Sequence, residues 1–457
     1  MIIESEVLES VFPGVADKID SPVHGVAIDS RMVKEGEIFF AIIGGNNDGH
    51  VYIKQAISNG AIAVVVQHGY DAATSVPVII VEDTTKALGN LAKQFWARHK
   101  VPCVLVTGSC GKTTCTSMLN GIFSKDRKVL TPIKNYNNEY GLPLTILSLM
   151  EEHNFAVFEV ASRNPGDLEY LVDICTPDVA LVTNVAPVHI ERFIDLDGIA
   201  KEKATVYRAL ESKGIAIVNS DDVYAPYFLS NIKKQRVISF GIDCPADVTC
   251  GKIKIFKNRL EFVALTPIGE ILVNVPCIGV HNIVNILAVI AVAIAADVSM
   301  ASIVSGLSTF KSKPQRLNVI NGVNNSTVID DTYNANPLSM QASLSTLDAM
   351  PGVKKVFVMG DMAELGEHSK SMHMLIGSQA KSLGVSMFLG YGNDTRYACE
   401  AFGSSGHHFN DKMELTKVLY KILDKTTVVL VKGSRSMKME DIIKKISLSE
   451  MTETQGN

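Results

Sequence analysis

The sequence predicts an α/β protein of three domains: a small N-terminal α/β domain, a central doubly wound parallel sheet, and a C-terminal Rossmann-like α/β domain. The chain has 457 residues, which corresponds to roughly three domains of ordinary size. From residue 101 onward, short apolar runs alternate with helical stretches, the pattern of parallel sheets covered by helices. A polar linker at 311–316 separates two such series. We therefore expect domains over 1–84, 85–310 and 311–457.

The composition excludes several classes of protein. The formal net charge of −5 gives no basic field for nucleic acid or anionic lipid. The N-terminus lacks a basic leader, and the longest aliphatic run, 286–296, is too short to span a bilayer. The eight cysteines include no C-x-x-C pair, which argues against a zinc site and a disulfide framework. We expect a soluble cytoplasmic monomer without nucleic-acid or membrane partners.

The N-terminal domain is predicted to contain short strands and one helix over 51–59, and a helix over 85–100 follows it. The strands are expected at 25–29, 37–42, 61–67 and 78–82. Polar and small residues stand at strand ends, where α/β sheets bind ligands. Loops of this composition are as often ordinary turns. The candidate ligand-binding residues are Ser30, Arg31, Asp48, Gly49 and His50.

The central domain begins with an apolar run that breaks into a glycine-bearing loop ending in Lys112. A buried strand over 103–106 and a helix from Lys112 are predicted. Gly108 and Gly111 allow a tight turn, so that amide hydrogens and the helix N-terminus point at an anion. The general pattern G-x-x-x-x-G-K-S/T requires glycine where Val106 stands, so the match is imperfect.

This loop predicts a nucleotide site. Lys112 is expected to reach the terminal phosphates, and the Thr113 hydroxyl to hold Mg²⁺. A strand-turn-helix corner can carry two glycines and a lysine without binding anything, but lysine directly before paired threonines at a helix start then has no explanation. The other loop residues of the candidate site are Thr107, Ser109, Cys110 and Thr114.

Two residues at the ends of later strands are candidate metal ligands. Strands are predicted at 155–160, 178–185, 214–219 and 237–241, with antiparallel additions at 252–265 and 270–275. Glu159 ends an apolar run, and a buried acid costs several kcal/mol unless it is paired or bound to metal. His189 follows the next strand. A salt bridge for Glu159 and a satisfied loop histidine for His189 are the alternatives.

Two further groups of polar residues in the central domain are less specific. Lys201, Glu202 and Lys203 are expected to form a solvated helix face. Asn282 and Asn285 begin an apolar helix predicted over 282–296, where they either cap the backbone or meet a nucleotide base.

The third domain carries a dense polar segment, D-D-T-Y-N-A-N-P, at 330–337. Strands are predicted at 327–330, 355–360, 385–390 and 427–431. The segment precedes a helix with Pro337 in its first turn, and it holds more polar groups than an N-cap requires. In the linker, the Arg316 guanidinium either reaches a phosphate across the domain boundary or is solvated. No Ser-His-Asp, Cys-His or G-x-S-x-G arrangement stands out, so phosphoryl transfer from ATP is the expected chemistry.

Together these motifs resemble the Mur ligase family of peptidoglycan synthesis over nearly the whole chain. The resemblance rests on T-G-S-C-G-K-T-T at 107–114, N-N-E-Y-G-L-P at 137–143, Glu159, N-V-A-P-V-H at 184–189, H-N-I-V-N at 281–285 and Arg316. The short loop looks like that family's ATP loop, which explains the missing first glycine.

Within the family, D-D-T-Y-N-A-N-P, G-D-M-A-E-L-G at 360–366 and V-K-G-S-R-S-M-K-M-E at 431–440 are most similar to members that add D-alanyl-D-alanine to UDP-N-acetylmuramoyl-tripeptide. The resemblance implies an ATP- and Mg²⁺-dependent amide ligase that acts through an acyl phosphate. The first domain would bind the UDP-sugar peptide, the second ATP, and the third the dipeptide while closing over ATP. Another Mur ligase, such as the one adding the third amino acid, and a non-catalytic nucleotide-gated module are the alternatives.

The resemblance also implies roles for individual residues. Thr113, Glu159 and His189 would hold metal ions, and Lys203 stands where relatives carry a carbamylated lysine. Asp331 would contact the ribose and Arg316 the γ-phosphate, next to Asn282 and Asn285. The implied substrate contacts are Asn137, Asn138, Tyr333, Asn334 and Asn336, together with the candidates of the first domain.

The chain departs from the family pattern in two loops. The usual E-x-G-A-N-H-x-G-E reads E-V-A-S-R-N-P-G-D at 159–167, with Ala161 and Asn164 in place of glycine and histidine. His189 is followed by I-E-R-F-I-D instead of L-E-x-F-G-S.

Overall fold

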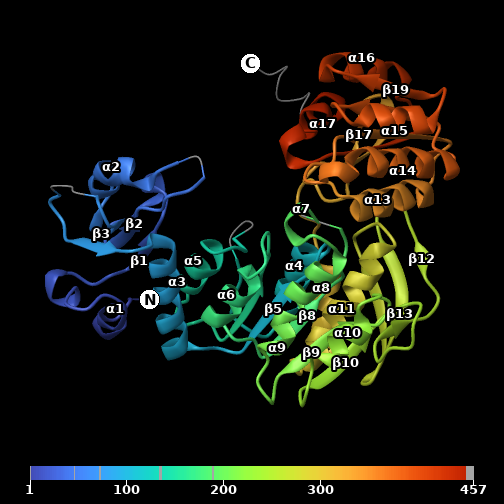
Figure 1. The fold of residues 1–457 in the computed structure, drawn as a ribbon. Coiled ribbons are helices and arrows are strands. Elements are labelled where there is room, and N and C mark those ends of the chain that lie inside the picture. Colours follow the sequence, from blue (N-terminus) through green and yellow to red (C-terminus); the bar gives the residue numbers. More distant parts are fainter. Residues whose placement is uncertain (1, 46, 71–73, 133–135, 188–189, 449–457) are drawn as a thin grey trace.

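The computed structural model describes residues 2–45, 47–70, 74–132, 136–187 and 190–448. Three α/β units follow one another along the chain, with the N-terminal unit to one side of the central unit and the C-terminal unit above it (Figure 1). This confirms the predicted fold class. In the described ranges, no helix has the length and apolar character needed to cross a membrane.

The first unit is a four-stranded parallel sheet. Its order is β1 (Gly25–Ala27), β2 (Glu37–Phe40), β3 (Ala61–Gln67) and β4 (Val78–Val81), and all four strands lie within the ranges predicted for them. The helix predicted over 51–59 is divided, because the chain first forms a 3₁₀ turn, η3 (Gly49–Tyr52), before α2 (Ile53–Ser58). Further helical segments are α1 (Ser5–Val11), η1 (Ala16–Lys18) and η2 (Ser30–Met32).

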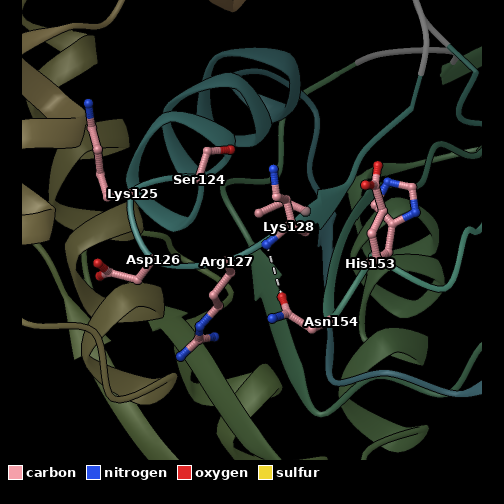
Figure 2. Close-up of a pocket in the computed structure, with 9 residues that line it drawn as sticks. Ser124, Lys125, Asp126, Arg127, Lys128, His153 and Asn154 are labelled. Atoms are coloured by element: carbon pink, nitrogen blue, oxygen red, sulfur yellow. Dashed lines mark hydrogen bonds between the residues drawn. The ribbon is translucent and has the colours of Figure 1, made fainter.

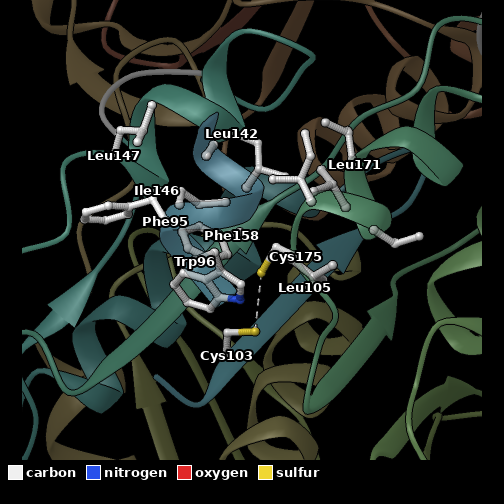
Figure 3. Packing of buried hydrophobic residues seen from close by; sticks show 14 of the residues in the cluster. Phe95, Trp96, Cys103, Leu105, Leu142, Ile146, Leu147, Phe158, Leu171 and Cys175 are labelled. Carbon is white, nitrogen blue, oxygen red and sulfur yellow. Dashed lines mark hydrogen bonds between the residues drawn. The ribbon is translucent and has the colours of Figure 1, made fainter. Parts of the chain in front are cut away.

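Helix α3 (Thr84–His99) ties the first unit to the second. Its apolar face belongs to a single buried cluster that includes Phe40 of β2 and Phe158 of the central sheet. The Trp96 ring meets Phe158 edge-on at 5.5 Å between centroids, and the thiols of Cys103 and Cys175 face each other nearby (Figure 3). The first two units therefore share one hydrophobic core.

The central sheet has six parallel strands. The order is β10 (Arg236–Phe240), β9 (Ile215–Asn219), β8 (Val179–Val182), β5 (Cys103–Thr107), β7 (Phe155–Glu159) and β6 (Val129–Leu130). The order reverses at β5, whose neighbours are β7 and β8, and ligands of such sheets bind beyond the strand ends at this switch point. The polar residues after β5, β7 and β8 are therefore brought together.

Helices cover both faces of this sheet. On one face, α4 (Lys112–Phe123) and α11 (His281–Ala295) pack against the strands, and α12 (Met300–Ser308) packs on α4. Because α11 is apolar on nearly all sides, it is buried along almost its whole length. The other face carries α3, α5 (Gly141–Ile146), α6 (Asp167–Ile174) and α9 (Thr205–Arg208). The remaining helices are α7 (Ile190–Phe193), α8 (Leu196–Lys203) and α10 (Ala225–Ser230).

A small antiparallel sheet follows, as predicted, but its first long strand is divided. It consists of β11 (Thr249–Cys250), β12 (Lys254–Ile255), β13 (Leu260–Thr266) and β14 (Gly269–Val275). The prediction of one strand over 252–265 is wrong, since the Phe256 N–H donates to the Arg259 carbonyl and closes a turn. This turn makes β12 and β13 a hairpin.

The third unit is a six-stranded sheet that is parallel except for its first edge strand. The order is β15 (Asn318–Asn321), β16 (Thr327–Asp331), β20 (Thr427–Lys432), β17 (Lys354–Gly360), β18 (Met387–Tyr391) and β19 (Gly406–Phe409). The helices are α13 (Pro337–Ala349), α14 (Ser369–Ser382), α15 (Thr395–Phe402), α16 (Lys412–Ile422) and α17 (Glu440–Ile446), with 3₁₀ turns η4 (Val323–Asn325), η5 (Gly366–His368) and η6 (Arg435–Met437). Ile278, which precedes α11, packs into the core of this unit.

Candidate active site

The phosphate loop connects β5 to α4 and has two positions that only glycine can occupy. Gly108 (φ +146°) and Gly111 (φ +86°) adopt backbone conformations that other residues rarely do. A Cβ atom on Gly108 would lie 1.8 Å from the Thr183 Oγ1, and one on Gly111 would lie 2.4 Å from the Asn285 Oδ1. The two glycines therefore let the loop press against the end of β8 and the start of α11.

The residues after β8 hold the loop in place. The Cys110 N–H donates to the Asn184 Oδ1 at 2.9 Å, and the Thr183 hydroxyl donates to the Cys110 carbonyl at 2.5 Å. The Ser109 N–H donates to the Asn184 carbonyl at 3.0 Å. Thr183 and Asn184 thus fix a loop whose amides and helix N-terminus face a cavity.

Lys112 is the first residue of α4 and folds back over the loop. Its Nζ donates to the Gly108 carbonyl at 2.6 Å. Burial lowers the pKa of Lys112, while the nearby Glu159 carboxylate acts in the opposite direction. A phosphate group in the loop would replace a carbonyl with a far stronger anionic partner for this ammonium.

Thr113 joins the loop to the interdomain linker. The Arg316 Nη2 donates to the Thr113 Oγ1 at 3.2 Å. The same guanidinium lies over the Tyr333 ring, with its Cζ 4.1 Å from the ring centroid. Of the two alternatives for Arg316, the structure supports a contact across the domain boundary.

Glu159, at the end of β7, is 6% exposed and accepts a hydrogen bond from the Asn137 Nδ2 at 2.7 Å. Glu159 forms no ion pair with another described residue. Thr113 and Glu159 provide a hydroxyl and a carboxylate, which are oxygen ligands suited to Mg²⁺. His189, the third predicted ligand, lies outside the described residues, and no three His, Cys, Asp or Glu side chains gather within them.

The prediction of a solvated face at the end of α8 is wrong for two of its three residues. Lys201 is exposed, but Glu202 and Lys203 are only 8% and 3% exposed. The Glu202 carboxylate accepts from the N–H groups of Gly166 and Leu168 at the start of α6. Composition could not reveal this, because the helix is buried by its packing against α6.

Lys203 is a buried lysine that has no ion-pair partner among the described residues. Across the described ranges, its ammonium has no hydrogen-bond or ion-pair partner. Burial lowers the pKa of Lys203 to about 7, and the positive charge of Lys112 acts in the same direction. A lysine in this state is partly neutral near pH 7 and lines the same cavity as Lys112.

The third domain supplies the opposite wall of the cavity. Asp331, at the end of β16, pairs with Lys432 at the end of the adjacent strand β20, with 2.6 Å between Oδ2 and Nζ. The Asp331 Oδ2 also accepts from the Ser343 hydroxyl at 2.7 Å. The Asp331 carboxylate therefore lines the cavity and is held in place by Ser343 of α13 and Lys432 of β20.

The polar segment before α13 has a structural role as well as a place in the cavity. The Asn336 side chain accepts from the Ser339 N–H at 2.8 Å, while the Ser339 hydroxyl accepts from the Asn336 N–H, which makes a capping box. The Asn336 Nδ2 also lies 3.4 Å from the Cys110 Sγ in the phosphate loop. The segment therefore does supply an N-cap, and three of its polar residues, Tyr333, Asn334 and Asn336, also line the cavity.

The start of α11 borders the cavity from the central domain. The Asn282 Nδ2 donates to the Ile278 carbonyl at 2.7 Å, and the Asn285 Nδ2 donates to the Asn282 Oδ1 at 3.0 Å. His281 lies beside them, and burial lowers its pKa to about 4. Among described groups, the buried His281 Nδ1 has no hydrogen-bond partner.

The cavity itself has a volume of about 700 Å³ and lies between the central and third domains. Seven lysines and arginines line it against three carboxylates, which suits a polyanionic ligand. Of the predicted nucleotide-site residues, Thr107 does not line it and is fully buried. The predicted residues that the cavity brings together are Gly108, Ser109, Cys110, Gly111, Lys112, Thr113, Thr114, Asn137, Glu159, Lys203, Asn282, Asn285, Arg316, Asp331, Tyr333, Asn334 and Asn336.

The candidates of the first domain do not line this cavity. The His50 Nε2 accepts from the Gln67 N–H at 3.0 Å and its Nδ1 donates to Asp48 at 2.6 Å, so both ring nitrogens are used within the domain. Ser30 is buried and bonds to Gln55, whereas Arg31 is exposed and pairs with Asp29. Asn138, also outside the cavity, accepts from the Gly141 N–H at the start of α5.

A second hollow of about 570 Å³ lies at the opposite end of α4, around residues 124–129 and 152–154 (Figure 2). Several of its polar groups bond within the fold. The Lys128 N–H donates to the Asn154 Oδ1, and the Arg127 guanidinium donates to the Ala296 carbonyl. None of the predicted site residues lines this hollow.

Comparison with known proteins gives a consistent result along the chain. Family models match residues 22–96 ("Mur ligase family, catalytic domain"), 106–293 ("Mur ligase middle domain") and 315–435 ("Mur ligase, glutamate ligase domain"). The UDP-N-acetylmuramoyl-tripeptide–D-alanyl-D-alanine ligase of Escherichia coli is 36% identical over 442 residues, which cover 96% of each chain. The chain belongs to the Mur ligase family.

Solved structures of Mur ligases have the same fold. A crystal structure of MurF from Acinetobacter baumannii matches with a TM-score of 0.91 and 30% identity, covering 99% of each chain. MurF from Thermotoga maritima in complex with ADP matches with a TM-score of 0.82 and 27% identity, covering 94% of this chain and 99% of that one.

Several residues of this cavity or its support were not among the predicted site residues. Lys432 ends the apolar run of β20 as Glu159 ends that of β7, so the same buried-charge signal could have identified it. Thr183 and Asn184 support the phosphate loop, but nothing in their local sequence indicates which loop they contact. Lys313, a half-buried lysine of the linker, also lines the cavity.

Proposed function

We propose that this Mur ligase joins D-alanyl-D-alanine to UDP-N-acetylmuramoyl-tripeptide with consumption of ATP. The proposal is supported by the similarity to the Escherichia coli ligase of that name over 96% of the chain. Bound Mg²⁺-ATP would supply the phosphoryl group that activates the tripeptide carboxylate as an acyl phosphate, with ADP as the leaving group. The dipeptide amine would then attack the acyl carbon and displace inorganic phosphate, which forms the amide.

The chain's own residues would position the reactants and balance their charge. The loop amides and Lys112 would hold the phosphates, and Thr113 and Glu159 would hold Mg²⁺, since all of them line the cavity. His189 belongs to the same proposal on its sequence alone. Arg316 and Asp331 complete the nucleotide site from the linker and the third domain, next to Asn282 and Asn285.

A carbamylated Lys203 is part of the proposed site. Carbon dioxide reacts with a neutral amine, and the lowered pKa of Lys203 keeps a large fraction neutral near pH 7. The resulting carboxylate would remove the repulsion between Lys203 and Lys112 and add an oxygen ligand for metal.

We also propose which ligand each domain binds. Residues 1–84 would bind the UDP-sugar peptide through Arg31 and its neighbours, 85–310 the nucleotide, and 311–457 the dipeptide through the segment from Tyr333 to Asn336. We place the reaction in the cytoplasm, which is supported by the eight free cysteines.

A phosphate-release assay with ATP and Mg²⁺ tests the function. We expect release only when both UDP-N-acetylmuramoyl-tripeptide and D-alanyl-D-alanine are present. Lys112→Ala should abolish release, whereas Lys125→Ala, an exposed lysine just beyond the same helix, should change it less than about twofold. Release without either peptide substrate would favour the nucleotide-gated module, and release with a free amino acid would favour another Mur ligase.

A further inference from the structure

The linker between α12 and β15 forms one wall of the cavity. Its lining residues include Phe310, Lys313 and Arg316. The third domain holds its backbone, since the Leu317 N–H donates to the Asp331 Oδ1 at 3.3 Å and the Gln315 carbonyl accepts from the Tyr333 N–H at 3.1 Å. The cations of the linker are therefore carried on a fixed segment.

The backbone around Arg316 is also strained. Gln315 (φ 65°) and Leu317 (φ 52°) both adopt the left-handed conformation, which residues with side chains adopt at a cost. Because two of three consecutive residues adopt this conformation, we infer that tertiary contacts fix the backbone of the linker here. The positions of the neighbouring side chains are thereby fixed as well.

Most cations of the cavity wall already have partners. Lys432 pairs with Asp331, Arg435 pairs with Glu440, and Arg316 contacts Thr113 and Tyr333. Lys313 differs from these three, because within the described residues its ammonium, like that of Lys203, makes no hydrogen bond or ion pair. Its charged neighbours are Glu159 and Arg316, and burial lowers its pKa.

We propose that Lys313 binds the terminal phosphate of the nucleotide together with Lys112. Glu159 and Thr113 mark the end of the cavity where the metal and the terminal phosphates would lie. Lys313 lines the same cavity and is close enough to Glu159 for that carboxylate to act on its charge. The start of α11, with Asn282 and Asn285, offers amides and no cation, so it suits the uncharged part of the nucleotide. The inference rests on the nucleotide-binding part of the proposed function.

The test compares two nucleotides, by calorimetric titration of the full chain in the presence of Mg²⁺. Lys313→Met should weaken a non-hydrolysable ATP analogue by about tenfold, because a charge-assisted contact to the terminal phosphate is lost. The affinity for ADP, which lacks that phosphate, should change less than about twofold. Lys313→Arg should retain most of the affinity for the analogue.

Lys311→Met is the matched control, since Lys311 is an exposed lysine of the same linker, and it should alter neither affinity. The assignment would be overturned if Lys313→Met weakened the binding of ADP and of the analogue equally, or if it weakened the binding of neither. Lys313→Gln repeats the measurement if the Met variant melts at a lower temperature. No peptide substrate is present, so the outcome does not depend on which acceptor the enzyme uses.

Discussion

The Arg316 guanidinium connects the linker to the phosphate loop: its Nη2 lies 3.2 Å from the Thr113 Oγ1, while its face covers the Tyr333 ring at 4.1 Å. Three chain segments that are distant in sequence meet at this one side chain. A planar, permanently charged group can stack on a ring and donate in its own plane at the same time. Lysine cannot do both.

We therefore expect Arg316→Lys to lower the rate of phosphate release at least about tenfold, although the charge is kept. Tyr333→Phe retains the ring and should stay within about threefold of the unchanged enzyme, whereas Tyr333→Ala should approach the Arg316→Lys rate. Steady-state phosphate release measures all three variants. Full activity of Arg316→Lys would show that charge alone suffices.

Below pH 7, the rate of phosphate release should depend on the concentration of carbon dioxide because of Lys203. The neutral amine is the form that reacts, and with a pKa of about 7 its fraction falls as the pH drops below 7. At pH 6, added bicarbonate should therefore raise the rate. Labelled bicarbonate should give a carbamate NMR signal that Lys203→Met loses and the exposed Lys201→Met keeps. A signal that persists in Lys203→Met would contradict the assignment.

His281 should weaken the fold in acid. Its pKa is lowered from 6.5 to about 4 by burial, so between these values the unfolded chain binds a proton that the folded chain does not. Stability is then lost as the pH falls from 6.5 to 4, by about 3 kcal/mol in all. His281→Gln should flatten the pH dependence of the urea midpoint in this window. His407→Gln, at an exposed histidine, is the control, and identical curves for both variants would refute the prediction.

Replacing Ile194 with glycine should stabilise the protein. It is a β-branched residue at φ 70°, 89% exposed, in the loop where the family pattern has glycine. Ile194→Gly relieves a left-handed conformation and exposes no new apolar surface, so we expect the free energy of unfolding to rise by about 1 kcal/mol. Ile194→Val keeps the branched carbon and should change little. Urea unfolding measures both, and a less stable glycine variant would show that the side chain contributes to stability.

Periodic patterns in the sequence predicted most of the fold correctly. Apart from the two-residue edge strand β6, which was not predicted, the strands of the first two sheets begin and end within a few residues of their predicted positions, because apolar runs bounded by turns are a local signal. The edge strands β15 and β19 were missed. They are short and partly polar, and β19 contains His407 and His408, so their pairing is set by the neighbouring strand.

The site was predictable where a residue type is unusual for its place, and not where tertiary packing decides. Lys112 and Glu159 stand out because charged residues at the edges of apolar runs require an explanation. The burial of Glu202 and Lys203 depends on the packing of α8 against α6, which no local pattern records. The His50 ring nitrogens are likewise occupied by the distant Gln67 and by Asp48, so a motif alone could not separate a structural histidine from a binding one.

The contact between Cys110 and Asn336 has a thermodynamic consequence. Asn336 begins α13 in the third domain, and Cys110 belongs to the phosphate loop. A ligand that draws α13 toward this loop raises the affinity for a ligand in the loop by some factor, and reciprocity then requires the second ligand to raise affinity for the first by the same factor. Two ligands bound on either side of this contact would then share a single coupling free energy, whichever arrives first.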